Sequence, residues 1–229
     1  MRVIDSHVHF PEDRIIDDGS PLEASPAKAD SSAPAPAKGT GYSSGRTGKH
    51  EHPWLESEKE RWEKAWRFPT PVAVSKQEGE RLWRKEVDDR EWLKGVVLVT
   101  SGSNDFAAEL VGRNQGAFQG YAHHDPLLSD APERLERALA AGLRGYKMLG
   151  PKIDRSLDDP SFNPLWEVAA AREIPVLIHF GIMGGAGGIA NHMNINPMVI
   201  HDVAKRFPRM PIIIPHFGCG YLFETLNLC

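Results

Sequence analysis

The chain has 229 residues, 41% of them hydrophobic and 25% charged, as expected of a globular protein with one large or two small domains. Its formal net charge of -4 provides no basic surface for nucleic acid, and no apolar run reaches the ~18 residues of a membrane span. The two cysteines lie close together near the end, and a strand begins at once after Met1. These features predict a cytoplasmic protein without a disulfide framework or a signal peptide.

The first apolar run, residues 3–10, predicts a strand that ends in two histidines one residue apart. Side chains at positions i and i+2 of a strand point to the same side, so His7 and His9 would project together. Two imidazoles on one rigid strand form half of a metal site, and we predict that both are metal ligands. A second pair with the same spacing, His50 and His52, lies in a polar stretch and is predicted to be solvated.

Residues 11–94 are predicted to be an insertion after this strand. Residues 20–53 are mostly small and polar and predict a low-complexity loop, which either covers the site or is a passive insertion. Residues 54–93 contain five of the six tryptophans and predict amphipathic helices. These helices would pack against the main body or a partner subunit, or else form an aromatic lid.

From residue 95 onward, apolar runs alternate with helix-start signals. A capping-box pattern at Asp130 and Glu133 predicts the start of one helix, and Pro164 and Pro197 fit the first turns of two others. Between and around the helices, strands are predicted at residues 95–99, 117–123, 143–149, 174–179 and 211–216. This repeat is typical of a doubly wound sheet or a (β/α)8 barrel.

Polar residues at the ends of the predicted strands decide between these two folds. No Gly-x-Gly-x-x-Gly pattern follows the first strand, as a dinucleotide-binding sheet would require. In a barrel, catalytic side chains from the ends of many strands meet at one mouth. The sequence therefore favours an α/β fold of the (β/α)8 TIM-barrel type, with the following residues at strand ends: His7, His9, His123, His124, Lys147, His179 and His216.

The motifs at these strand ends resemble the amidohydrolase superfamily. They are Ile-Asp-Ser-His-Val-His at residues 4–9, Gly-Tyr-Lys at 145–147, Leu-Ile-His-Phe-Gly at 177–181 and Ile-Pro-His-Phe-Gly at 214–218. The most similar branch is the amidohydrolase-related group, which includes aminocarboxymuconate-semialdehyde decarboxylase, resorcylate-type decarboxylases and small-lactone hydrolases. The resemblance covers residues 1–10 and about 95–226.

The resemblance implies a metal-dependent barrel that is incomplete in this chain. Residues 1–10 and 95–229 would form about six βα units, whereas a closed barrel of this type has eight. The family also places a metal-binding aspartate at the end of strand eight, and no residue here has that position. Glu224 lies just after the sixth predicted strand, in what is expected to be its helix.

Site roles follow from the same resemblance. His7, His9 and His179 would bind one divalent metal, usually zinc, and His216 would be the general acid/base beside a metal-activated water. Without the resemblance, the residues themselves also allow His179 to be a core histidine and His216 to be a fourth ligand or a structural residue. Lys147 is predicted to contact a substrate anion or to form a structural ion pair; in some relatives it is carboxylated and bridges two metals. His123 is predicted to bind substrate at the mouth, although a solvated loop position is also compatible.

The predicted function is metal-dependent hydrolysis of a small amide or lactone. The alternative is non-oxidative decarboxylation of an aromatic or unsaturated carboxylic acid. A second alternative is a catalytically inactive, truncated scaffold that binds metal or forms oligomers. The predicted partners are a small-molecule substrate and a second subunit in a homodimer, with neither nucleic acid nor membrane.

Overall fold

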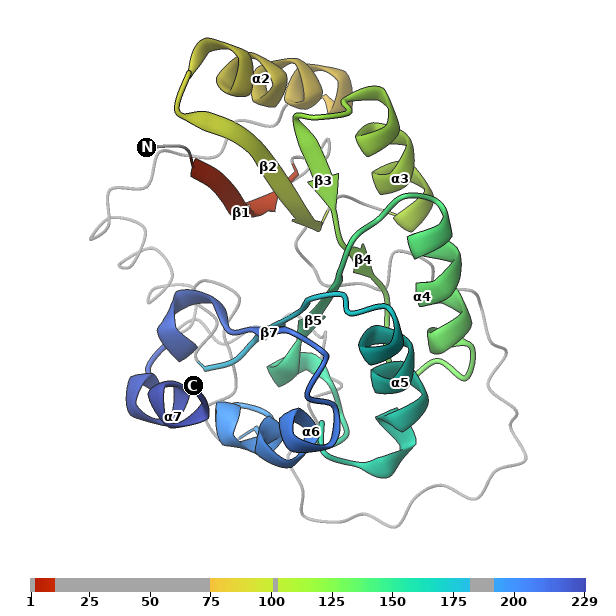
Figure 1. Ribbon diagram of the computed structural model, residues 1–229, viewed down its shortest axis with the longest axis vertical. Coiled ribbons are helices and arrows are strands. Elements are labelled where there is room, and N and C mark those ends of the chain that lie inside the picture. Colours follow the sequence, from red (N-terminus) through yellow and green to blue (C-terminus); the bar gives the residue numbers. More distant parts are fainter. Residues whose placement is uncertain (1–2, 11–74, 101–102, 182–191) are drawn as a thin grey trace, which may run out of the picture.

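A computed structural model describes residues 3–10, 75–100, 103–181 and 192–229, and its strands form an arc covered by helices on the outside (Figure 1). Every strand pair is parallel, as predicted for βα units. The predictions for residues 11–74, including the pair His50 and His52, lie outside the described residues. The strands are β1 (Val3–His9), β2 (Leu93–Thr100), β3 (Phe118–Gly120), β4 (Ala122–His123), β5 (Tyr146–Leu149), β6 (Val176–His179) and β7 (Ile212–Ile213).

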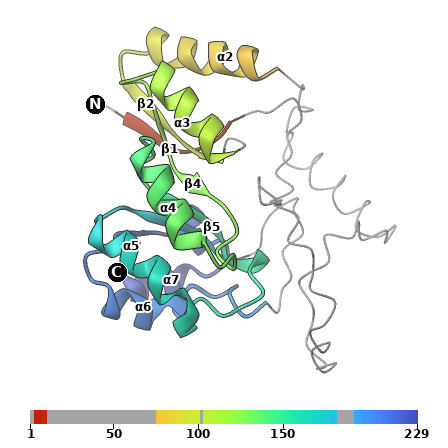
Figure 2. The same ribbon diagram turned by 90° about the vertical axis from the view of Figure 1, so that its right-hand side faces the viewer.

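Helices alternate with these strands and lie along one side of the arc (Figure 2). This arrangement is that of an incomplete α/β barrel, as predicted. The helices are α2 (Lys76–Asp89), α3 (Asn104–Arg113), α4 (Ala131–Ala140), α5 (Asn163–Ala171), α6 (His201–Arg206) and α7 (Leu222–Leu228). Short 3-10 turns are η1 (Gly150–Lys152), η2 (Pro160–Phe162), η3 (Pro197–Ile200) and η4 (Pro215–Gly218).

The sheet is divided into two parts, ordered β1-β2-β3 and β4-β5-β6-β7. The predicted strand at 117–123 is interrupted at Tyr121, whose N–H donates to the Leu98 carbonyl at 2.9 Å. The next N–H, that of Ala122, donates to the carbonyl of Gly145 at 2.8 Å. One chain segment therefore joins the two parts, because it changes its hydrogen-bonded neighbour at this residue.

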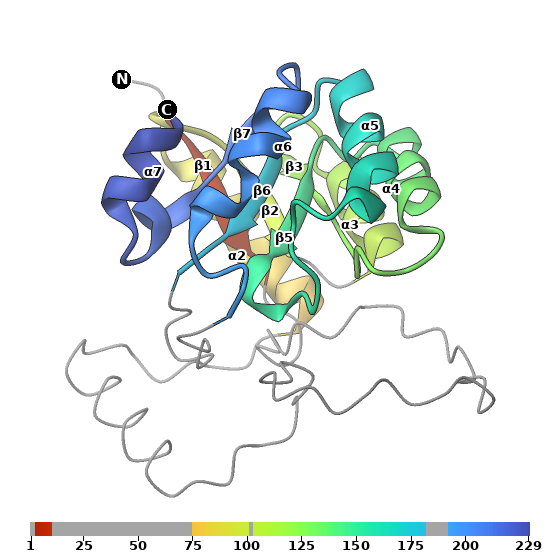
Figure 3. The ribbon, with the colours of Figure 1, turned by 90° about the horizontal axis from the view of Figure 1, so that it is seen from below.

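Alternating side chains give the arc an outer and an inner face. Outward-pointing residues such as Val96 and Leu98 pack with α2 and α3, and Tyr146 and Val176 pack with α4 and α5. Figure 3, seen from below, shows the helices outside the strands. A separate buried cluster lines the inner face: Val97, Val99, Tyr121 and Leu177, with Ile213 partly buried against it. Any side chain in register with this inner set points into the barrel.

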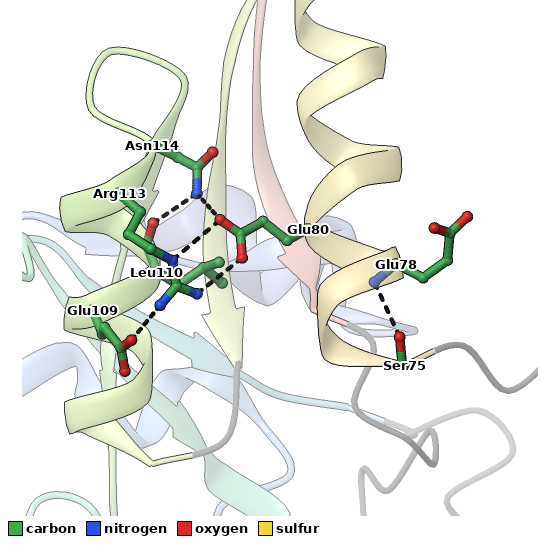
Figure 4. A network of polar contacts seen from close by, with 7 residues as sticks. All are labelled: Ser75, Glu78, Glu80, Glu109, Leu110, Arg113 and Asn114. Atoms are coloured by element: carbon green, nitrogen blue, oxygen red, sulfur yellow. Dashed lines mark hydrogen bonds and ion pairs between the residues drawn. The ribbon is translucent and has the colours of Figure 1, made fainter.

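An ion-pair network joins α2 to α3 over the first three strands (Figure 4). Arg113 contacts Glu80 at 2.9 Å and also pairs with Glu109 on its own helix. The Asn114 amide donates to Glu80 at 2.6 Å and to the Leu110 carbonyl at 2.9 Å. The α2 helix lies within residues 54–93, where amphipathic helices are predicted, and its Trp83 and Val87 pack on the buried cluster of β1 to β3, whereas Leu82 is exposed.

Three local predictions differ from the structure. Asp130 precedes α4 but makes no side-chain capping bond, because its carboxylate accepts from the Arg134 guanidinium at 2.8 Å instead. The helix expected after Asn196 begins as the 3-10 turn η3 before it becomes α6. The strand expected over 211–216 is only two residues long, and His216 follows it within η4. Pro215 explains part of this shortening, since it has no N–H to donate to a sheet.

The two ends of the arc expose edges and apolar side chains. Among the described residues, neither β1 nor β7 has a second neighbouring strand. Large exposed hydrophobic side chains lie on these end elements: Ile4, Phe217, Leu222, Phe223 and Leu226. Within the described ranges, no helix has both the length and the hydropathy needed to span a bilayer.

Candidate metal centre

The strand β1 directs its two histidines to the inside of the arc. Val8 and Phe10 are buried in the outer cluster under α2 and α3. Because side chains alternate along a strand, His7 and His9 point to the opposite, inner face. They lie at the carboxyl end of β1, which is the end of the strands where barrel enzymes carry their active sites.

Four imidazoles that are far apart in the sequence come together at this end. The ring centroid of His7 lies 5.1 Å from that of His9 and 4.8 Å from that of His216. The His216 ring in turn lies 5.2 Å from that of His179 at the end of β6. His216 therefore stands between the β1 pair and His179, and the parallel strands bring all four predicted histidines to one cluster.

Burial and neighbouring positive charge keep the imidazole of His7 neutral. Burial and the positive charge of Lys147, with smaller contributions from His9, His216 and His179, lower the pKa of His7 from 6.5 to about 3. The pKa of His216 is also lowered, mainly by burial and then by Lys147. A neutral imidazole is the form that binds a metal ion or accepts a proton.

A left-handed turn presents His216 to the cluster. His216, Phe217 and Cys219 have φ values of 56°, 51° and 49°, which are unfavourable for residues with a Cβ atom. Gly181, two residues after His179, packs directly beneath this turn: a Cβ there would overlap the carbonyl oxygens of Gly218 and Cys219. Strained backbone of this kind occurs at functional sites, where the surrounding structure maintains it.

Lys147 and His123 lie on the inner face next to the cluster. The two residues are in register on β4 and β5, and Lys147 is in register with the inward Leu177 on β6. Lys147 is completely buried, with its amine 3.5 Å from Nε2 of His7. His123 is partly buried, and its Nδ1 lies 3.0 Å from the Lys147 carbonyl oxygen. His124 points the other way and is buried, and its Nε2 lies 3.0 Å from the carbonyl oxygen of Ala131.

Asn194 was not anticipated from the sequence, and it connects the loops that follow β5 and β6. Its buried amide donates to the carbonyls of Ile153 and Arg155 at 3.0 and 2.8 Å, and its side-chain oxygen accepts from the Leu157 N–H at 2.9 Å. His192 is buried beside it, and its Nδ1 accepts from the Asn194 N–H at 3.1 Å. A lone asparagine within a loop gives no sequence signal for such a role.

Comparison with known proteins identifies the family. A family model described as Amidohydrolase matches residues 4–226. The chain belongs to the amidohydrolase family. Among curated proteins, none matches the chain significantly.

Several solved structures have the same fold as this amidohydrolase chain. A TIM-barrel protein from Bordetella bronchiseptica is 20% identical, with a TM-score of 0.56 over 76% of this chain and 63% of its own. A probable 2-pyrone-4,6-dicarboxylic acid hydrolase from Acinetobacter baumannii, with citric acid bound, is 13% identical, with a TM-score of 0.55 over 100% and 67%. A 5-carboxyvanillate decarboxylase from Novosphingobium aromaticivorans, complexed with manganese, is 15% identical, with a TM-score of 0.56 over 99% and 68%.

These likenesses establish the barrel fold of the amidohydrolase chain. The chain spans 63–64% of the length of the first three structures to which it is similar. The six strand positions seen here, with β3 and β4 counted as one interrupted strand, are thus those of an incomplete (β/α)8 barrel.

Two of the proposed ligands, His7 and His9, have the ring spacing of a tetrahedral metal site. With a metal–nitrogen distance of about 2.1 Å and roughly 1.1 Å from nitrogen to ring centre, two ligand rings would lie about 5 Å apart. The His7–His9 separation of 5.1 Å agrees with this value, and the other two separations, 4.8 and 5.2 Å, join His216 to His7 and to His179. In the described ranges, no three His, Cys, Asp or Glu side chains are arranged to hold an ion.

The lowered pKa of His7 predicts that acid destabilises the metal-free amidohydrolase. Below pH ~6.5 the unfolded chain protonates this histidine, whereas the folded chain leaves it neutral down to about pH 3. The unfolded state then binds more protons, so the free energy of unfolding falls as the pH drops through this window. Chemical denaturation of wild type and His7→Asn at pH ~7 and ~5 measures the effect.

We expect His7→Asn to lose less stability than wild type between these two pH values. His201→Asn is the matched control, because His201 lies on the exposed side of α6 and outside the cluster. Equal losses in wild type and His7→Asn would contradict the prediction.

Proposed function

We propose that this amidohydrolase is a metal-dependent hydrolase of small amides or lactones, with His7, His9 and His179 holding one divalent ion. The gathering of histidines from β1 and β6 around His216 supports this proposal, because the rings of His7 and His179 both contact that of His216 and the His7 and His9 rings have the spacing of two ligands of a tetrahedral ion. Imidazole ligands favour zinc, copper, nickel or iron over magnesium or calcium. A bound divalent ion would polarise the substrate carbonyl and lower the pKa of water towards ~7.

His216 is proposed as the general base and acid. Its pKa is lowered by burial and by Lys147, so at neutral pH its imidazole can accept a proton. Its ring contacts those of His7 and His179, so it would lie beside any ion that these residues hold. The left-handed turn fixes the backbone of His216, so little reorganisation would accompany the proton transfer.

Lys147 and His123 are proposed to define the substrate side of the centre. The buried Lys147 amine supplies a positive charge 3.5 Å from His7, which would favour a substrate with a carboxylate or a developing negative charge. His123 lies on the neighbouring strand position and is partly exposed to the mouth.

Non-oxidative decarboxylation of an aromatic or unsaturated acid is the second candidate function. The positive charge of Lys147 beside the cluster suits a carboxylated substrate, and one structure with the same fold is a 5-carboxyvanillate decarboxylase. In this reaction the chain's residues would hold the acid, the bond between carbon and its carboxyl group would break with release of carbon dioxide, and protonated His216 would deliver the proton that takes its place on carbon.

Paired measurements of metal and turnover test these proposals. We expect purified protein to contain about one divalent ion per chain, and to hydrolyse a small lactone faster than it decarboxylates a hydroxybenzoate. The His216→Asn variant should retain the metal but lose about 100-fold or more in turnover, because an acid/base group contributes ~10²–10⁴. Loss of metal from this variant would make His216 a ligand. Bound metal without activity on either substrate would favour the third reading, a non-catalytic scaffold.

A further inference from the structure

The strand β1 does not keep a regular register with β2. Asp5 pairs with Val96 of β2. The next paired residue of β1 is Val8, which lies opposite Leu98. Residues 6–7 of β1 therefore lie opposite a single residue of β2, which is the arrangement of a β-bulge.

The bulge decides which face of the barrel His7 occupies. Val96 and Leu98 both point outward, into the cluster under α2 and α3. In a regular parallel ladder His7 would lie opposite Leu98, two residues after Asp5, and would also point outward. The extra residue puts Val8 in that outward position instead, because a shift of one residue exchanges the two faces of a strand. His7 is thereby turned to the inner face, where its ring joins the histidine cluster.

The side chain of Asp5 holds the backbone inside the bulge. The N–H of His7 donates to Oδ1 of Asp5 at 3.2 Å. An aspartate that accepts from the N–H two residues later forms a turn of its own, which competes with the straight ladder of a sheet. The distortion is local, because β1 returns to its former register at His9, opposite Thr100. A single bond from a side chain is therefore well placed to stabilise it.

We propose that Asp5 is a positioning residue for the metal centre: its bond to the His7 N–H stabilises the bulge that turns His7 inward. Asp5 acts through the backbone and is not itself a ligand. The bond needs an acceptor oxygen at the length of an aspartate side chain, and it does not need the negative charge. This inference rests on the proposed function only in that it treats His7 as a ligand, since the bulge can be observed without any metal.

Amide hydrogen exchange of His7 in metal-free protein tests the bond directly. We expect Asp5→Ala to speed the exchange of this amide about fivefold relative to its intrinsic rate, since one hydrogen bond is lost. Asp5→Asn keeps an acceptor oxygen at the same position and should exchange within about twofold of wild type. Ser6→Ala is the matched control, because Ser6 is exposed in the same bulge and makes no side-chain hydrogen bond to a described residue.

The variant Asp5→Glu separates the hydrogen bond from the charge. Its carboxylate keeps the negative charge but is one methylene longer, so its oxygen no longer fits the short turn. We expect this variant to exchange as fast as Asp5→Ala. Slow exchange in Asp5→Glu together with fast exchange in Asp5→Asn would assign the effect to charge and would overturn the proposal. Wild-type exchange in Asp5→Ala would overturn it as well.

The position of the His7 ring provides the second measurement. Nuclear Overhauser effects between the rings of His7 and His216, whose centroids lie 4.8 Å apart, should weaken in Asp5→Ala. Those between His179 and His216, at 5.2 Å, should not change, because both residues lie outside β1. An unchanged effect between His7 and His216 would contradict the positioning role.

Zinc binding, measured by isothermal calorimetry, connects the bulge to the metal centre. We expect the affinity to fall about threefold to tenfold in Asp5→Ala and to recover in Asp5→Asn, because a group that orients a ligand contributes less than the ligand itself. Equal zinc affinities in wild type and Asp5→Ala would overturn the link to the metal. A wild type that binds no zinc would refute the proposed function alone, and the exchange and ring measurements would still decide the role of Asp5.

Discussion

Replacing His7 by alanine is expected to reduce the affinity for a divalent metal by at least about 100-fold. His7 is the member of the cluster with ring contacts to both His9 and His216, and it also contacts the Lys147 amine. Removal of groups that only orient ligands already costs ~10–100-fold in affinity, so loss of a ligand should cost more. Titration of chelator-treated protein with zinc, followed by isothermal calorimetry, measures the change.

His201→Ala is the matched control for this experiment. It removes one imidazole from an exposed position on α6, where the ring contacts Asp202 rather than the cluster. We expect its zinc affinity to equal that of wild type. Unchanged affinity in His7→Ala would place the metal elsewhere and would contradict the proposed centre.

Gly181→Ala should be strongly destabilising and should displace His216. At a φ of +72° an alanine costs about 1–2 kcal/mol. Its Cβ would also overlap the Gly218 and Cys219 carbonyl oxygens, and overpacking of this kind costs about 1–3 kcal/mol more. Since these oxygens belong to the turn that carries His216, we expect lower stability together with altered NMR signals of the His216 ring.

Gly112→Ala provides the comparison. Gly112 lies within α3, and a Cβ there meets nothing within 4 Å. Helix propensity then predicts a gain of up to about 1 kcal/mol. The interpretation of the Gly181 turn would be wrong if the two variants had similar free energies of unfolding.

The sequence predicted the barrel units and the identity of the cluster well, because both depend on local patterns. Alternation along residues 3–10 predicts the inward histidines, and the buried runs predict the parallel strands. The helix α5 begins at Asn163 and has a proline in its first turn, as the sequence predicted.

Details that depend on tertiary contacts were not predictable. Asp130 has the pattern of a cap, yet its carboxylate pairs with Arg134, a competition that sequence spacing does not resolve. The left-handed turn at His216 depends on its packing against Gly181, thirty-five positions earlier in the chain. Asn104, whose side-chain oxygen accepts from the N–H of His123 at 2.8 Å, has no motif of its own and is marked only by its position just after β2, where a barrel places its active-site loops.

The Asn194 side chain ties together two segments that follow neighbouring strands. A single buried amide joins the chain after β5 to the chain after β6, through carbonyls and an N–H that span Gly150 to Leu157. Residues 150–157 and the segment at Asn194 can move only together, because parting them would leave several buried polar groups without partners. A molecule that enters the barrel beside Asn194 would therefore meet a surface that is already shaped before it binds.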